Sequence, residues 1–509
     1  MRATATCLAL VALALPASAA GAPGSGRAHS NRLVERARAN RLVERARALL
    51  GETAAGARAS EAGHRHGHLT PINVRLARAL PSLSGGLRRR VASLLARPTD
   101  PMDPDGHSYP PAARSQVASD CTAHFCVHWV NSAAFADAPD LTDLSPANGV
   151  PDFVDQVEAV AEQVHATENG TLGWRAPRPD GTLGGNARTD IYLADVGETL
   201  FGYASPDPGQ AGRRRHAYLV LDDDYSSAQF PGTTSITDIE VTLAHEYNHV
   251  LQFGYDTFQD LWMMESSATW MEDRVYGSVN DYLRYMSRWN DRFRIPLTRS
   301  SIKIYGSAVW NHWLAHRYGP DLIRTAWEDA LGARPTAFSV ASYGAAIEAA
   351  GASDFDRDFA LFARDLAEWR VDTAFPEGDS YPDVARQGSL PTNGARRLRS
   401  LDHTTYRLLR VAPAPGRALK LTATVRSRAS VAICLVGRIG SQTAGTVVSA
   451  FRMRRGPGSL AVGLPDPQRF DRITAVLVNA DTAIAGVGAL GWRYTGNDVR
   501  FVLRARLRR

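Results

Sequence analysis

The sequence lacks several features that would place it in a familiar class. No stretch after the first twenty residues approaches the ~18 apolar residues of a membrane-spanning helix, so no membrane span is expected. Only four of the 509 residues are cysteine. Only two are lysine, an arginine bias from which we infer no function. At 44% hydrophobic and 22% charged residues, the chain is not collagen-like, coiled-coil or wholly disordered. Its length predicts about three domains.

The N-terminus has the features of a secretory signal peptide. Arg2 precedes an apolar run at residues 8–15, and small residues follow at 17–19. We predict a signal peptide at residues 1–19 and therefore a secreted, extracellular protein.

Export leaves three cysteines in an oxidising compartment: Cys121, Cys126 and Cys434. We predict a disulfide between Cys121 and Cys126. In one extended strand their Cα atoms would be about 16 Å apart, so the bond requires a turn between them.

Charge divides the chain into three parts. Residues 21–100 hold 15 arginines against 5 acidic residues, residues 101–395 hold 21 basic against 42 acidic, and residues 396–509 hold 21 basic against 5. Complementary charge suggests that the basic N-terminal segment lies across the acidic part until it is removed. The basic C-terminal part could dock there too, or bind an anionic cell-surface polymer. No recognised nucleic-acid-binding module accompanies the charge, so nucleic-acid binding is not expected.

The N-terminal segment, residues 20–100, contains a nine-residue repeat at 31–39 and 40–48 with apolar residues at helical spacing. It predicts either a helical, basic pro-region or a disordered N-terminal segment. A Pro- and Asp-rich linker at residues 98–111 places the first boundary.

The middle part predicts strands followed by helices, which is an α+β order. Strands are expected at 124–130, 190–194 and 217–221, and helices at 151–165, 238–251, 261–276, 307–317, 320–330 and 354–371. Beyond residue 396, short β-like runs are expected at 418–425, 431–436, 446–451, 473–478 and 499–507. We therefore predict an α+β catalytic domain at 101–395 and a β-sandwich accessory domain at 396–509.

Residues 245–249 read HEYNH. Histidines four apart lie on one face of a helix, where one Zn²⁺ can take a nitrogen from each. Glu246, next to the first histidine His245, could act as general base toward the water that the ion activates. Thr237 and Glu240 predict a capping box for this helix. The alternative is a pair of buried helix histidines, His245 and His249, around a lost metal site.

A catalytic zinc needs a third protein ligand. Gln252 and Tyr255 stand where a short three-histidine form would have Gly and His, and Asp256 is one residue out of register with the related Asp form. Glu265 is the better candidate, because small residues beside it permit close approach to the metal helix. Otherwise Glu265 is a helix-face carboxylate, and Asp256 or Glu272 is the substitute ligand.

Residues 262–272 resemble the second helix of the gluzincins, the clan of thermolysin-like and aminopeptidase-N-like zinc peptidases, which reads W-x-x-E-x-x-A-x-[WY]-x-E. The matching residues are Trp262, Glu265, Ala268, Trp270 and Glu272. More broadly, residues 121–327, with the segments NGVPDFVDQV, DIYLAD and AHEYNHVLQFGYD, resemble a family of secreted bacterial metalloproteases.

The resemblance implies a zincin-like catalytic domain that binds one zinc ion per chain. Its ligands would be His245, His249 and Glu265. Glu272 would orient a ligand histidine through its other ring nitrogen. Tyr305, at the start of a following helix, would hydrogen-bond the oxyanion of the tetrahedral intermediate.

These features predict a secreted zinc metalloprotease acting on protein or peptide substrates. Endopeptidase activity is favoured, because the chain lacks the G-x-M-E-N segment that anchors the substrate amine in the related aminopeptidases. The alternative is a non-catalytic exported binding protein on an inactive zincin scaffold, acting through its basic C-terminal domain. The sequence does not separate peptide hydrolysis from hydrolysis of another amide.

Other clusters could bind metal but have simpler explanations. The three histidines at 64–68 and the aspartates at 222–224 predict solvated loops, with Ca²⁺ the alternative for the aspartates. His312 and His316 repeat the four-residue spacing without an intervening glutamate. On a strand, His124 and His128 would lie about 13 Å apart, too far for one ion. We expect structural roles for all four of these residues.

Overall fold

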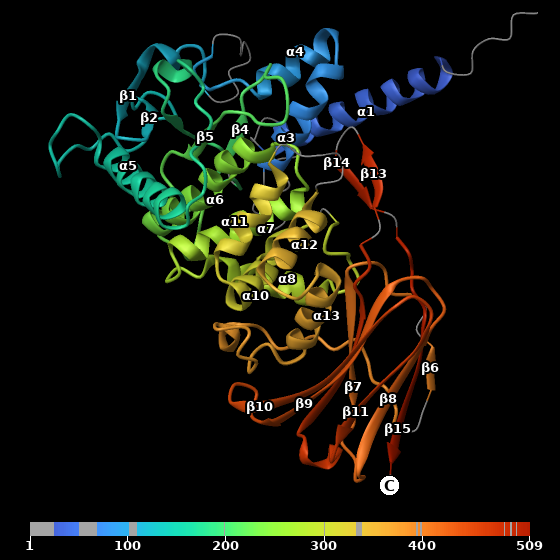
Figure 1. Ribbon diagram of the computed structural model, residues 1–509. Helices are drawn as coiled ribbons and strands as arrows, with labels where there is room; N and C mark the ends of the chain where they lie inside the picture. Colours follow the sequence, from blue (N-terminus) through green and yellow to red (C-terminus); the bar gives the residue numbers. More distant parts are fainter. Residues whose placement is uncertain are drawn as a thin grey trace, which may run out of the picture.

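A computed structural model describes residues 25–49, 69–100, 109–197, 199–299, 301–331, 338–392, 395–397, 400–482, 484–488, 491–494 and 496–508. The predicted signal peptide and the histidine tract at 64–68 lie outside these residues. The described chain runs through N-terminal helices, a five-stranded sheet, a helical layer and two antiparallel sheets, which is a mixed α+β architecture (Figure 1).

The five-stranded sheet has the strand order β1-β2-β3-β5-β4. Its strands are β1 (Val117–Cys121), β2 (Phe125–Val130), β3 (Thr189–Ala194), β4 (Gly202–Pro206) and β5 (Ala217–Asp222). The three central strands β2, β3 and β5 are parallel, and each edge strand is antiparallel to its neighbour. The central strands are buried along their whole length, as their continuous apolar runs predict. Neither edge strand was predicted, because β1 lacks a clear apolar alternation and β4 contains Gly202 and Pro206.

Strands β1 and β2 form a hairpin that is closed by the predicted disulfide between Cys121 and Cys126. His124 lies in the turn, so the expected strand at 124–130 begins one residue too early. His128 is buried in β2, and its Nε2 lies 2.7 Å from a carboxylate oxygen of Asp190 on β3.

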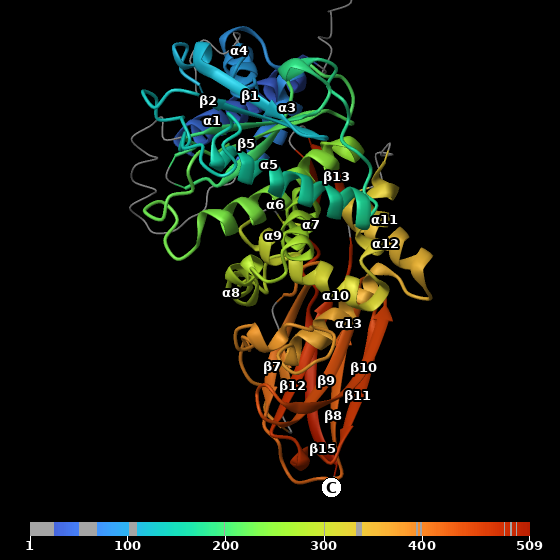
Figure 2. The same cartoon turned by 90° about the vertical axis from the view of Figure 1, so that its left-hand side faces the viewer.

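A layer of helices follows the sheet. Its members are α6 (Ser235–Asp256), α7 (Leu261–Val275), α8 (Met286–Asp291), α9 (Lys303–Gly306), α10 (Ala308–Tyr318), α11 (Asp321–Ala330), α12 (Ser339–Ala350) and α13 (Phe355–Asp365). Helix α6 packs on α7 and on strands β4 and β5, while α5 (Asp152–His165) covers β2. Figure 2 shows this layer between the five-stranded sheet and the C-terminal sheets. No helix in the described ranges is long and apolar enough to cross a bilayer.

Helix α6 begins three residues before the predicted start. Its N-cap is Thr234, whose side chain forms a capping box with Thr237, so the predicted box of Thr237 with Glu240 is wrong. Several hydroxyl residues in succession can each cap a helix, and the sequence alone does not show which one does.

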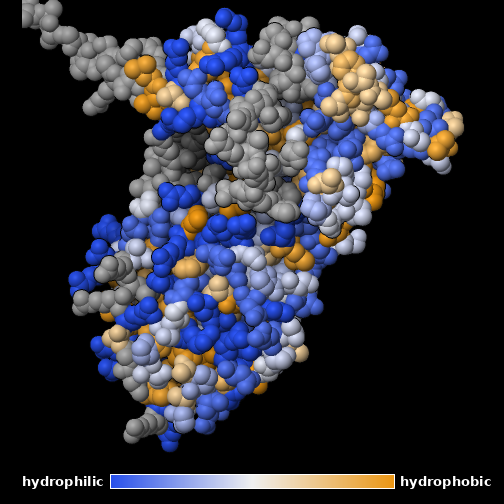
Figure 3. Space-filling model, turned by 180° about the vertical axis from the view of Figure 1, so that it is seen from behind, coloured by the Kyte–Doolittle hydropathy of each residue, from blue (hydrophilic) through white to orange (hydrophobic). Residues whose placement is uncertain are grey.

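The C-terminal part forms two antiparallel four-stranded sheets, in the orders β10-β9-β12-β7 and β11-β8-β15-β6. The strands are β6 (Ala395–Arg397), β7 (Thr405–Val411), β8 (Ala418–Val425), β9 (Ser430–Gly440), β10 (Gly445–Arg455), β11 (Gly458–Pro465), β12 (Arg472–Asn479) and β15 (Phe501–Arg508), with a separate hairpin of β13 (Ile484–Gly488) and β14 (Gly491–Tyr494). Buried side chains of both sheets belong to one hydrophobic cluster. Hydrophilic residues cover much of this part in the view from behind (Figure 3).

The N-terminal helices are α1 (Ser25–Leu49), α3 (Thr70–Ala79) and α4 (Gly85–Leu94). Helix α3 packs on β4, and α1 packs on α3 and α4. Arg97, just after α4, is 5% exposed and forms ion pairs with Asp180, Asp190 and Asp207. Residues 69–100 therefore share a core with the sheet that follows them.

A buried charge cluster connects the helical layer to the C-terminal sheets. Glu368, which follows α13, lies 2.6 Å from Arg386, 3.6 Å from Arg472 and 3.8 Å from Arg438. Burial raises the pKa of Glu368, while the three arginines act to lower it. Each partner therefore depends on the others to remain charged inside the protein.

We expect Glu368→Gln to destabilise the protein by about 3–5 kcal/mol, because it leaves buried arginines without their carboxylate. The measurement is the free energy of unfolding in urea. Arg455→Gln is the control: Arg455 is 64% exposed where it meets Asp354, and a surface pair of this kind contributes about 0–1 kcal/mol. Equal effects of the two substitutions would contradict a role for the buried cluster.

Candidate metal centre and catalytic site

Two histidines of α6 and one glutamate of α7 converge in the interior. His245 Nε2 lies 3.1 Å from His249 Nε2, and the Glu265 carboxylate lies 3.5 Å from each of these nitrogens. The exposed fractions are 8%, 0% and 1% for His245, His249 and Glu265. These side chains form one of the groups in the described chain whose spacing would allow a metal ion.

The other ring nitrogen of each histidine is held by an acceptor. His245 Nδ1 lies 2.6 Å from the Glu272 carboxylate, and His249 Nδ1 lies 2.8 Å from Gln252 Oε1. Gln252 is oriented by its amide nitrogen, which donates to the Asn248 side chain and to a backbone carbonyl. Each acceptor orients its ring with Nδ1 as the donor, and a ring that is neutral then turns its Nε2 lone pair toward the other ring.

Three acceptors, two imidazole nitrogens and a carboxylate, thus face one point. A tetrahedral zinc site with bonds of about 2.0–2.1 Å would separate its ligands by roughly 3.3 Å, close to the observed separations. Burial raises the pKa of Glu265, but the charge of His249 and contacts with both imidazoles hold it well below its usual range. One Glu265 oxygen has no hydrogen-bond partner although it is buried. The donor set fits a divalent cation.

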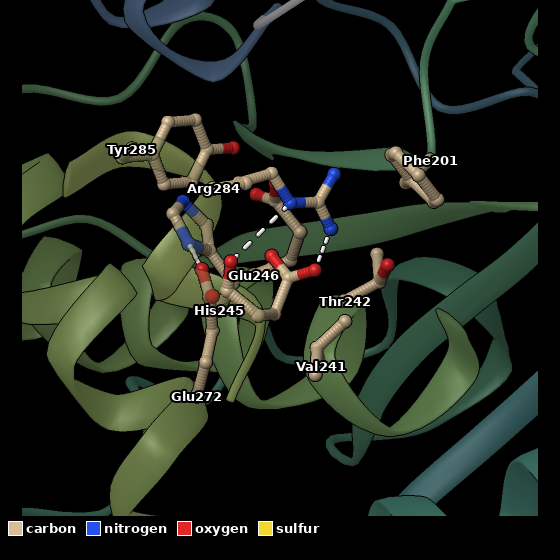
Figure 4. Close-up of a pocket in the computed structure, with 10 residues that line it drawn as sticks. Phe201, Val241, Thr242, His245, Glu246, Glu272, Arg284 and Tyr285 are labelled. Carbon is tan, nitrogen blue, oxygen red and sulfur yellow. Dashed lines mark hydrogen bonds and ion pairs between the residues drawn. The ribbon is translucent and has the colours of Figure 1, made fainter. Parts of the chain in front are cut away.

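Glu246 lies beside this cluster in a pocket that also contains Thr242, Phe201 and Arg284 (Figure 4). Its Oε2 accepts a hydrogen bond of 2.9 Å from the Ala204 backbone nitrogen on β4. Figure 4 shows Glu272 reaching His245 on the same side of the pocket. Glu246, the predicted general base, therefore lies next to the predicted ligands and lines a cavity.

Tyr305 lies close to the cluster, on the short helix α9 rather than at the start of α10. It is 3% exposed, and its ring centroid is 6.4 Å from that of His245. Burial raises the pKa of Tyr305 well above its usual range, and the negative charge of Glu265 adds to this shift. The phenol keeps its proton and is a hydrogen-bond donor.

Other predicted candidates lie elsewhere. Asp256 pairs with Arg213 at 2.5 Å and is not part of the metal-site cluster. His312 is buried, which lowers its pKa to about 3, in accord with a structural role. At the surface, His124, Glu162 and His165 form a further group with metal-compatible spacing, but the two imidazole rings stack 3.6 Å apart and Glu162 is hydrogen-bonded to the His124 turn. This group of His124, Glu162 and His165 is a cluster that the sequence alone did not reveal.

Of the aspartates at 222–224, which were expected in a solvated loop, only Asp224 is exposed. Asp222 is fully buried and Asp223 is 6% exposed. Burial, followed by the charges of Asp222, Asp224 and Asp195, raises the pKa of Asp223 to about 8. Asp137 has a pKa raised to about 7 by burial and by Asp195. Asp222 ends β5, and Asp223, Asp195 and Asp137 come after β5, β3 and β2, whose carboxyl ends share one edge of the sheet.

Gln252 is the site residue that sequence reasoning missed. In the sequence it stands out only as a departure from a three-histidine pattern, although its position three residues after His249 places it on the same helix face. Comparison with protein-family models and with curated proteins finds no match to this chain.

We expect Glu272→Gln to weaken Zn²⁺ affinity about 10–100-fold, because the His245 ring loses its charged hydrogen-bond acceptor. Affinity is measured by competition with a chromophoric chelator. The control is Glu240→Gln, at a partly buried residue of α6 outside the metal-site cluster, which should leave affinity unchanged. Unchanged affinity in Glu272→Gln would show that His245 is not a ligand held through this contact.

Proposed function

We propose that this chain is a secreted zinc-dependent metalloprotease of the gluzincin type, with a zincin-like catalytic domain and endopeptidase activity. The observation that carries the proposal is the convergence of His245, His249 and Glu265 on one point, with Glu246 beside them. The sheet supports it as well. Its antiparallel edge strand β4 lies over the helix that bears the histidines, and Ala204 of β4 presents a backbone N–H there.

The residues of the site have complementary tasks in this proposal. A Zn²⁺ ion held by the three ligands would supply Lewis acidity, which polarises a substrate carbonyl and activates water near neutral pH. Glu246 would take the proton of the attacking water and pass it to the leaving amine. The protonated Tyr305 would donate a hydrogen bond to the oxygen that becomes negative. Glu272 and Gln252 would hold the two imidazoles in position.

The basic C-terminal sheets support an accessory role. On β15, Arg504, Arg506 and Arg508 alternate with buried residues and are exposed, so they form a positively charged row. Such a row would attract an anionic cell-surface polymer in a salt-dependent way. Retention on anionic cell-wall material that does not weaken with salt would count against this role.

We expect Glu246→Gln to lower casein hydrolysis about 10²–10⁴-fold while the zinc content stays at one ion per chain, because the base is lost and the ligands are not. Activity and metal content are measured on the same purified samples. Glu240→Gln on the same helix is the matched control and should retain both.

The opposite results would separate the alternatives. Wild-type protein without metal would favour a non-catalytic exported binding protein that acts through the basic C-terminal sheets. Zinc without casein hydrolysis would leave a narrow specificity, a different amide substrate or a blocked site.

We also propose a Ca²⁺ site at Asp222, Asp223 and Asp224, whose carboxylates lie close enough together to hold one ion. In the absence of a cation, Asp223→Asn should stabilise the protein, because it removes one of several repelling buried carboxylates. With Ca²⁺ present, the wild type should be more stable than Asp223→Asn, since it gains a binding free energy of about 2.7 kcal/mol at a Ca²⁺ concentration 100 times Kd. Melting temperatures with EGTA and with Ca²⁺ test this. Asp321→Asn, at an aspartate that is 71% exposed, is the control. A wild type that does not respond to Ca²⁺ would contradict the site.

A further inference from the structure

A cavity of about 220 Å³ lies beside α7, apart from the pocket at Glu246. Glu272 lines the pocket at Glu246, whereas Asp273, the next residue of α7, lines this other cavity. The cavity is bounded by α7, α10, the short helix η5 (Asp281–Tyr285) and the segment at 376–381. Such a volume holds several water molecules or one small organic molecule.

Three buried polar atoms on the wall of this cavity have no hydrogen-bond partner among the described residues. They are Asp273 Oδ1, His312 Nε2 and Trp270 Nε1. The side chain of Asp273 is 8% exposed, and its Oδ2 lies 3.8 Å from His312 Nδ1, too far for a hydrogen bond. Trp270 is 1% exposed. Because buried polar groups are normally paired, three unpaired ones on one cavity point to a polar occupant.

The charges on the wall favour a positively charged occupant. Asp273 and Glu377 are acidic, Arg274 is basic, and burial lowers the pKa of His312 to about 3, so that its imidazole is neutral. Burial and the charge of Glu377 raise the pKa of Asp273 to about 7, although Arg274 acts to lower it. The surrounding protein therefore does not balance the charge of the Asp273 carboxylate, and a cation in the cavity would do so.

Aromatic rings form another part of the wall. Tyr282 is fully buried, and its ring centroid lies 4.4 Å from that of His312. The Tyr282 hydroxyl donates a hydrogen bond to the Glu377 carboxylate and lies 3.1 Å from the Tyr381 hydroxyl. These contacts hold both tyrosines in place. Carboxylates together with aromatic rings are the combination that recognises organic cations.

A metal ion suits this cavity less well than an organic cation. Asp273, Glu377 and His312 do not form one of the groups in the described part of the chain whose ligand atoms lie close enough together for a metal ion. An ammonium or guanidinium group has several N–H donors on a larger frame, so it can reach acceptors that are farther apart.

We propose that this cavity is a binding site for a small organic cation that carries a primary ammonium or guanidinium group. Its N–H groups would donate hydrogen bonds to Asp273 Oδ1 and to the neutral imidazole of His312, beside the ring of Tyr282. The inference does not depend on the proposed function, because none of these residues belongs to the proposed catalytic site.

The test is a ligand-observed NMR titration of the full-length chain at pH 8, where Asp273 is ionised. The probes are n-butylammonium and methylguanidinium, and we expect saturable binding with a Kd of about 0.1–10 mM. The uncharged n-butanol and the anion butyrate should not bind.

Asp273→Asn should weaken binding of the positive probes about tenfold to a hundredfold, because a hydrogen bond to a charged group is lost. Asparagine has nearly the same shape and removes a buried charge, so we expect this variant to fold. Asp321→Asn, at an aspartate that is 71% exposed, is the matched control and should bind the probes as the wild type does.

The outcomes decide between the site and its alternatives. Binding of either positive probe that is weakened in Asp273→Asn and kept in Asp321→Asn supports the site. Positive probes that bind no better than n-butanol, or equally well to Asp273→Asn and wild type, overturn it. Displacement of a bound probe by Ca²⁺ or Zn²⁺ at lower concentration would show a metal site instead. The readout needs no catalysis, so failure of the protease proposal would leave this result unchanged.

Discussion

Three hydrogen-bond acceptors face one another where α6 packs on α7, and much of the structure serves to hold them there. Nε2 atoms 3.1 Å apart repel each other when both carry lone pairs, and the Glu265 carboxylate adds a third acceptor. A positive charge at their centre relieves this repulsion. Burial lowers the pKa of His245, but Glu265 and Glu272 raise it well above its usual range. Even without a metal, the site favours a cation.

The local part of this site was predictable from the sequence because it depends on helix geometry. A spacing of four residues places His245 and His249 on one face whatever the rest of the fold does. Glu265 and Glu272 are seven residues apart, two turns of one helix, so both reach the same side of α7. The disulfide was predictable for a similar reason, since only four residues separate Cys121 from Cys126 and the two meet across a hairpin.

The remainder depends on contacts between distant segments, which spacing does not encode. Thr70 reaches Glu246 from 176 residues away, and no local feature of α3 marks it as a partner of the site. The residues of β4 only weakly predict a strand. The position of this strand is set by its pairing with β5 and its packing on α6. The sequence predicts Asp222 and Asp223 to be exposed loop residues. They are buried because of their place at the sheet edge, which their neighbours in the sequence do not reveal.

The anchoring of the N-terminal segment makes it part of the fold around the site. Arg97 forms three buried ion pairs with aspartates of the sheet region, and Tyr218 donates a hydrogen bond to the Ala96 carbonyl. Breaking a buried pair of this kind costs about 3–5 kcal/mol. Helix α3 adds the hydrogen bond of Thr70 to Glu246, the contact of Arg78 with Phe258 and its packing on β4. The attachment of residues 69–100 therefore combines buried charge pairs with packing against the elements that carry the site.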